Sequence, residues 1–149
     1  MLFAYLMLIL PLALAWPISL RGRNAEVLRL GGIIGASLCF VAFGVLHFVA
    51  AGTVMQMLPS WMPVRLELVY ATGALEILLG TALLVPRLRR AAGWGCVLAL
   101  LAFFPANIYS WLNGVDIPGH GSAVEFFLVR MNYQILLIAW IWWFAIRER

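Results

Sequence analysis

The sequence has few charged residues and no polar stretch long enough to build a water-soluble domain. Of its 149 residues, 11% are charged and 65% are hydrophobic, whereas soluble domains are about 25% charged and about 45–50% apolar. Lysine is absent, and all ten basic residues are arginine. This composition excludes a soluble globular protein and predicts that residues 1–149 form one integral membrane domain in a lipid bilayer.

Patterns typical of metal and redox centres are also missing. Cys39 and Cys96 both lie in apolar segments, and the sequence has neither a Cys-x-x-Cys pair nor Cys/His spacing suited to a metal. We interpret both cysteines as small buried side chains. With no haem-ligand pair or flavin motif, we expect no metal and no intrinsic cofactor. A transporter or channel is disfavoured, because the chain is short and lacks internal repeats.

Long hydrophobic runs make up most of the chain. A membrane-spanning helix needs about 20 apolar residues, and only a helix satisfies the backbone of such a segment in lipid. The runs cover Met1–Leu20, Leu30–Ala51, Leu66–Val85, Ala91–Leu112 and Val124–Ile146. We therefore expect an all-α membrane protein with five spans. The first run resembles a signal peptide at Ala13-Leu14-Ala15, but it has no positive n-region. We expect a retained helix, kinked or unwound near Pro11 and Pro17.

The arginines alternate between the loops. Arg21, Arg23 and Arg29 precede the second run, Arg87, Arg89 and Arg90 precede the fourth, and Arg147 and Arg149 end the chain. The positive-inside rule then predicts an outside N-terminus and a cytoplasmic C-terminus. Because these arginines act as topology signals, the net charge of +4 gives no reason to expect nucleic acid as a partner.

Glu76 lies in the middle of the third run, where a lone carboxyl costs at least about 2.5–3.5 kcal/mol. Thr72, Gly73 and Gly80 share its helix face, at spacings of three and four. Small residues allow close helix packing in a bilayer, so Glu76 is expected to face other helices. It is either a hydrogen-bonded structural carboxyl or a proton-handling or ligand-binding group.

Four further polar residues are expected at a similar depth on other helices. His47 is a candidate to share a proton with Glu76, or a packing residue. Asn107 follows Pro105 and either binds a ligand or satisfies backbone freed by the proline. Arg130 and Gln134 share one face of the last helix; Arg130 points inward or snorkels to the interface. Together these residues predict one polar pocket open toward the outside.

Several motifs resemble those of the DoxX-like family of small bacterial membrane proteins. They are Gly44-Val45-Leu46-His47-Phe48, Leu58-Pro59-Ser60-Trp61-Met62-Pro63, Tyr70-Ala71-Thr72-Gly73-Ala74-Leu75-Glu76, Pro86-Arg87-Leu88-Arg89-Arg90-Ala91-Ala92 and Phe104-Pro105-Ala106-Asn107-Ile108, with Arg130 and Gln134. The resemblance implies a four-helix bundle over residues 30–149, preceded by an added helix and cytoplasmic loop over 1–29. It also implies a multi-pass location in the bacterial inner membrane.

The resemblance to this family favours a small accessory subunit beside a redox partner protein. Its pocket would bind a quinone-like or small apolar ligand. Glu76 and His47 would then carry protons as candidate catalytic residues, while Asn107, Arg130 and Gln134 would hold polar oxygens of the ligand. Two alternatives remain: a noncatalytic assembly protein, and an isomerase-like enzyme that moves protons on a lipid-soluble substrate. Whether the chain is catalytic, and whether it forms a homo-oligomer, stays open at this point.

Overall fold

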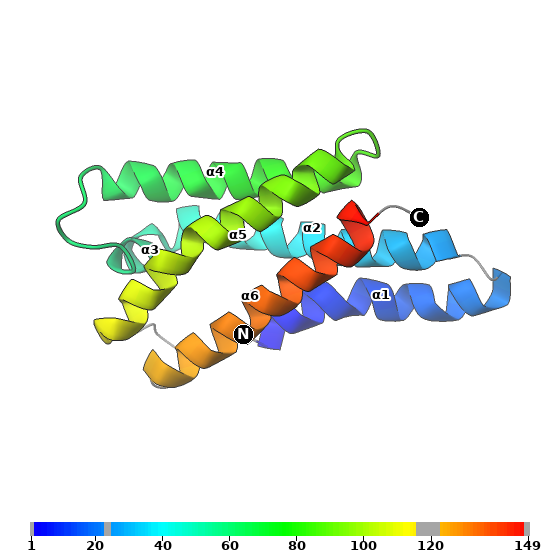
Figure 1. Ribbon diagram of the computed structural model, residues 1–149, viewed down its shortest axis with the longest axis horizontal. Helices are drawn as coiled ribbons and strands as arrows, with labels where there is room; N and C mark the ends of the chain where they lie inside the picture. Colours follow the sequence, from blue (N-terminus) through cyan, green and yellow to red (C-terminus); the bar gives the residue numbers. More distant parts are fainter. Residues whose placement is uncertain (1, 23–24, 116–122, 148–149) are drawn as a thin grey trace.

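The computed structural model describes residues 2–22, 25–115 and 123–147, and within them every regular element is helical (Figure 1). Arg23, Arg149 and the turn-rich segment 116–122 lie outside the described residues. The elements are α1 (Leu2–Gly22), α2 (Ala25–Val49), α3 (Ala51–Gln56), α4 (Arg65–Leu84), α5 (Arg89–Leu112), α6 (Ala123–Ile141) and the π-helical turn η1 (Trp142–Ile146).

Five helical segments are long and apolar enough to cross a membrane, which confirms the predicted number of spans. α2 begins at Ala25, earlier than the predicted Leu30, because long charged side chains near a helix end can reach the interface. α1 runs unbroken through Pro11 and Pro17, so the helix is not unwound there. Each proline removes only one backbone hydrogen bond. The remaining backbone N–H and C=O groups have no hydrogen-bond partner in lipid other than the helix, so the helix continues through both prolines.

Glycines set how closely α2 approaches its two main neighbours. A Cβ added to Gly35 would lie 2.3 Å from the carbonyl oxygen of Leu8 on α1. A Cβ on Gly44 would lie 2.7 Å from the carbonyl oxygen of Gly73 on α4, and one on Gly80 would clash with Phe40. Backbones this close are typical of membrane helices that pack through small residues. α2 is therefore the central helix, with α1 and α4 on its two sides (Figure 1).

The hydrophobic core lies where α5, α6 and η1 cover these three helices. Its largest fully buried side chains include Leu8, Ile33, Phe40, Leu83, Leu137 and Ile141. Because they come from α1, α2, α4 and α6, one continuous core joins the N-terminal helix to the rest of the chain. The predicted division at residues 29 and 30 stays a prediction.

The two ends of the bundle differ in charge. The start of α2, the turn between α4 and α5, and η1 lie together at one end (Figure 1). We call it the arginine-rich end, because it carries Arg29, Arg87, Arg89, Arg90 and Arg147. The opposite end holds α3, the start of α4, the end of α5 and the start of α6.

α1 begins part-way along the bundle rather than at the opposite end (Figure 1). Ala4 lies beside Cys39, whose thiol donates a hydrogen bond to its carbonyl oxygen at 3.6 Å, and Leu8 lies beside Gly35. Since the two helices run antiparallel, the start of α1 lies level with about residue 41 of α2. The last two turns of α2 therefore extend beyond α1, and this is where the cavity described next is found.

Candidate functional site

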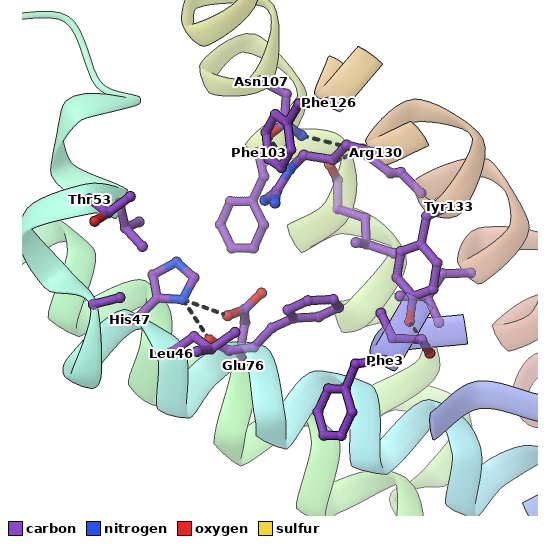
Figure 2. Close-up of a pocket in the computed structure, with 17 residues that line it drawn as sticks. Phe3, Leu46, His47, Thr53, Glu76, Phe103, Asn107, Phe126, Arg130 and Tyr133 are labelled. Carbon is purple, nitrogen blue, oxygen red and sulfur yellow. Dashed lines mark hydrogen bonds and ion pairs between the residues drawn. The ribbon is translucent and has the colours of Figure 1, made fainter. Parts of the chain in front are cut away.

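A cavity of about 560 Å³ lies between the helices (Figure 2). Because residues of α3 line it, it lies toward the end of the bundle opposite the arginine-rich end (Figure 1). Small-molecule sites have volumes of about 300–1,000 Å³. All five polar residues singled out from the sequence line it. The lining residues are Phe3, Ala4, Phe43, Leu46, His47, Ala50, Thr53, Val54, Glu76, Leu100, Phe103, Asn107, Phe126, Arg130, Tyr133, Gln134 and Leu137.

Glu76 and His47 meet on one side of the cavity. Gly73 precedes Glu76 by one turn, and a Cβ there would lie 2.5 Å from the Cβ of His47. The missing side chain lets α4 approach α2 closely enough for Glu76 Oε2 to lie 3.0 Å from His47 Nδ1. Both side chains are largely buried, at 6% and 15% exposure. The predicted glycine face of α4 thus places the carboxyl against the imidazole.

A single ring nitrogen faces two acceptors. His47 Nδ1 lies 2.9 Å from the carbonyl oxygen of Phe43, one turn earlier on α2, as well as 3.0 Å from Glu76. The buried Oε2 of Glu76 faces no hydrogen-bond donor among the described residues other than this ring nitrogen. A proton between Oε2 and Nδ1 would satisfy both atoms. This pair can therefore hold a proton on either the acid or the imidazole.

Arg130, Asn107 and Gln134 form a hydrogen-bonded chain on the other side. Arg130 Nε donates to Asn107 Oδ1 at 2.7 Å, and Asn107 Nδ2 donates to Gln134 Oε1 at 3.0 Å. Gln134 Nε2 completes the chain by donating to the Leu100 carbonyl oxygen at 2.6 Å. Asn107 and Gln134 are only 4% and 6% exposed. Every polar group of these two amides thus has a role in fixing the guanidinium.

Two alternatives left open by the sequence are settled by this chain. The side-chain hydrogen bonds of Asn107 among the described residues go to Arg130 and Gln134 rather than to the backbone near Pro105. Gln134, from α6, binds the carbonyl of Leu100, five residues before the proline. Arg130 does not snorkel to the interface. Its guanidinium points into the cavity beside Phe103 (Figure 2) and packs 5.7 Å from the ring centre of Phe126.

The terminal NH₂ groups of Arg130 are available to a ligand. Its one side-chain hydrogen bond among the described residues uses Nε, and no carboxylate lies within ion-pair distance of it there. Glu76 and His47 occupy the facing wall (Figure 2). Between the two polar groups the walls are aromatic and aliphatic, including Phe43, Phe103 and Leu137. The cavity therefore suits a flat apolar molecule that carries polar oxygens at opposite edges.

The entrance is formed partly by apolar side chains. Phe3 and Leu46 line the cavity, yet they are 66% and 47% exposed. The cavity therefore opens next to the first turn of α1, on the side of α2 that α1 does not cover. Because the side chains of Phe3 and Leu46 are apolar and exposed, this side of the bundle is suited to face lipid. The sequence prediction of a pocket open toward the outside did not anticipate this opening.

Sequence reasoning also missed two elements of the site. Phe3 and Ala4 come from α1, which was expected to be an addition to the bundle, and Thr53 and Val54 come from the short helix α3. None of them is charged, so no polar signal marked them. Tyr133 lines the cavity as well, and its hydroxyl donates to the Ala4 carbonyl oxygen at 3.4 Å. Among the described residues, no group of three or more His, Cys, Asp or Glu side chains is placed to hold a metal.

The fold and cavity define an all-helical, multi-pass membrane protein with a buried polar site. Residues 36–145, well over half of the chain, match the family described as Domain of unknown function (DUF8561), and the chain belongs to this family. The matched region contains all five polar cavity residues that were singled out from the sequence, but it begins within α2 and excludes α1. No curated protein and no solved structure matches the chain.

Proposed function

We propose that the protein is a small accessory membrane subunit of a quinone-linked redox system, and that its cavity binds a quinone-like ligand. One observation carries this proposal: the Glu76–His47 pair and the Arg130 guanidinium face each other across one apolar cavity. The proposal includes the location implied by the DoxX-like resemblance, the bacterial inner membrane. The arginine-rich end would lie in the cytoplasm and the cavity toward the periplasm.

The chemistry of a quinone fits this arrangement. Its ring is flat and apolar, and its two carbonyl oxygens lie at opposite edges. One carbonyl would accept hydrogen bonds from the NH₂ groups of Arg130, which Asn107 holds in place. The other would lie near His47 and Glu76, whose Nδ1 and Oε2 atoms are 3.0 Å apart. Reduction to the quinol takes two electrons and two protons. A redox partner protein would supply both electrons, the Glu76–His47 pair would deliver one proton to the near oxygen, and water would deliver the second proton to the far oxygen.

Ligand extraction and titration test the proposal. The protein, purified in mild detergent, is extracted with organic solvent and bound quinone is identified by mass spectrometry. It is then titrated with a short-chain ubiquinone or menaquinone analogue. Arg130→Gln removes a charged donor worth about 1.5–3 kcal/mol, so the dissociation constant should rise roughly 10-fold to 100-fold. Arg65→Gln, at the same end of the bundle but outside the cavity lining, is the matched control and should bind like the wild type.

Two results would contradict the proposal. The first is wild-type protein that contains no quinone after purification and binds none in titration. The second is equal quinone affinity in Arg130→Gln and Arg65→Gln, because the cavity guanidinium would then have no role in binding. If Glu76→Ala and His47→Ala are also severely destabilised in thermal melts, the noncatalytic assembly role expected as one alternative gains support instead.

The same geometry favours proton-transfer catalysis as a second candidate function. An acid–imidazole pair opposite a guanidinium can move a proton at a carbon next to a carbonyl, with the guanidinium holding the carbonyl oxygen. Glu76 would be the acid or base of such an isomerase-like enzyme. Glu76→Gln should then abolish turnover of a lipid-soluble ketone while far-UV circular dichroism stays unchanged. Full turnover in this variant would exclude the isomerase-like function.

A further inference from the structure

A second recess lies at the arginine-rich end, remote from the cavity. Its volume is about 260 Å³, and it lies between the start of α2, the turn from α4 to α5, and η1. The residues that line it are Arg29, Pro86, Arg89, Arg90, Ala145, Ile146 and Arg147. No acidic side chain is among these described lining residues. Four guanidinium groups thus surround one small volume.

Two of the arginines are fixed by the backbone. Arg29 Nε donates to the Phe144 carbonyl oxygen at 3.0 Å, and Arg89 Nε donates to the Leu83 carbonyl oxygen at 3.2 Å. A lone arginine in this role would simply satisfy carbonyls that a helix end leaves unpaired. Arg29 and Arg89 each bind a carbonyl oxygen, but they lie on different helices and line the same recess. Each contact uses Nε, which leaves the paired NH₂ edge of each guanidinium for another acceptor.

The concentration of positive charge exceeds what topology requires. The positive-inside rule depends on how many arginines a loop carries and is satisfied when they extend into water. Arg29 and Arg89 are instead partly buried in one recess, where their charges repel. Glu26 is close enough to Arg89 to offset part of this repulsion. The first turn of α5, which begins at Arg89, adds the positive end of a 24-residue helix dipole.

Aromatic residues place the recess at the depth of lipid head groups. Arg147 packs over the Trp143 ring, with its guanidinium carbon 4.4 Å from the ring centre. Trp143, Trp142 and Trp94 are each between 44% and 48% exposed. Exposed tryptophans of a membrane protein gather at the interface between head groups and acyl chains. A phospholipid beside these rings would carry its phosphate at the level of the four arginines.

We propose that this recess is a phosphate-binding site and that it takes the phosphate of an anionic phospholipid. Guanidinium groups bind phosphate oxygens in pairs of parallel hydrogen bonds, and basic pockets between transmembrane helices are suited to acidic head groups. A choline lipid carries the same phosphate, but its ammonium group is repelled by the remaining arginines. Phosphatidylglycerol and cardiolipin, which lack that cation, fit the recess better.

Native mass spectrometry of the purified full chain tests the site. The protein is released from detergent micelles that contain equal amounts of phosphatidylglycerol and phosphatidylcholine, and bound lipids are counted. The wild type should retain phosphatidylglycerol in preference. Each arginine near the membrane surface contributes roughly a fivefold change in affinity, so Arg29→Gln and Arg89→Gln should each weaken retention about fivefold. Arg87→Gln removes the same charge from the same turn but does not line the recess, and it should behave like the wild type.

Further arms separate the proposed site from general charge effects and identify the source of the phosphate. Arg89→Lys keeps the charge but loses the paired donor geometry, so it should bind less lipid than the wild type while melting at the same temperature in phosphatidylcholine. Excess inorganic phosphate that displaces the lipid would support a site for the phosphate group itself; retention unaffected by phosphate would support the lipid head group. Equal retention of both lipids by the wild type, or equal losses in Arg87→Gln and Arg89→Gln, would overturn the proposal.

Discussion

Asn107→Ala should destabilise the protein more than any other single amide replacement in the cavity. Asn107 and Gln134 each link α5 and α6 through one accepted and one donated side-chain hydrogen bond, but only the bonds of Asn107 include a charged donor, the guanidinium of Arg130. Its removal leaves Arg130 Nε without an acceptor and Gln134 Oε1 without a donor. In membrane proteins such interhelical bonds contribute on average about 0.6 kcal/mol and at most about 1.7. Since one of the two bonds involves a charged donor, we expect a loss of about 1–3 kcal/mol in the free energy of unfolding.

Reversible unfolding in mixed micelles, followed by far-UV circular dichroism as the fraction of denaturing detergent rises, measures this loss. Asn132→Ala is the matched control, because Asn132 is exposed and its side chain donates only to the Leu128 carbonyl oxygen on its own helix. Its cost should stay within about 0.5 kcal/mol. A double-mutant cycle between Asn107→Ala and Gln134→Ala should give a coupling energy above about 0.5 kcal/mol. Additive losses, or equal losses in Asn107→Ala and Asn132→Ala, would refute the hydrogen-bonded chain.

Three further predictions concern the helix contact beneath the site and its entrance. Gly44→Ala places a Cβ 2.7 Å from the Gly73 carbonyl oxygen, so α2 and α4 must separate, at a cost of about 1–3 kcal/mol in the same unfolding assay. Gly52→Ala meets no atom within 4 Å and should leave stability unchanged or raise it slightly; a cost as large as that of Gly44→Ala would contradict the packing. Leu46→Trp enlarges an exposed residue at the entrance and should slow quinone association without altering the melting temperature, which stopped-flow titration against the wild type checks.

The membrane spans could be predicted from the sequence because lipid imposes a strong constraint. A segment of about 20 apolar residues has no folded alternative to a helix there, so the number of spans was correct. The glycines flanking Glu76 also indicated which face of α4 packs against a neighbour, and Gly73 and Gly80 are indeed buried against α2. The predicted start of α2 was too late, because the hydrophobic run ends at Arg29 and Glu26. Both charged residues belong to the first turns of the helix.

The shared cavity and the contact of His47 with Glu76 could be predicted, but the hydrogen bonds among Asn107, Arg130 and Gln134 could not. All five residues were expected to share one pocket because the predicted topology places them in the outer half of the membrane or at its midplane. Which atom bonds to which depends on the rotation of α5 and α6 about their axes, and the sequence does not specify that rotation. Asn107 was therefore equally compatible with a local backbone contact until the structure placed Gln134 against the Leu100 carbonyl.

The position of α1 was the least predictable feature. Two apolar helices can slide past each other with little change in buried apolar area, so hydropathy does not fix their register. The register is instead set by Gly31 and Gly35, where a Cβ would strike the backbone carbonyl oxygens of Pro11 and Leu8. These contacts depend on how the surfaces of two helices fit together, so the sequence of one helix does not predict them.

α1 begins part-way along the bundle (Figure 1), so its first residues line the entrance of the cavity, whereas the polar groups that would bind a ligand lie on other helices. The groups that would recognise a ligand lie within residues 36–145, the region shared with the family, whereas Phe3 at the threshold lies in a helix outside that region. Substitutions in the first turn of α1 can therefore widen or narrow the passage for bulkier or slimmer molecules without disturbing the acid, the imidazole or the guanidinium. If the cavity binds the proposed ligand, the size of the molecules that enter would depend partly on α1, whereas recognition of their polar groups would depend on residues 36–145.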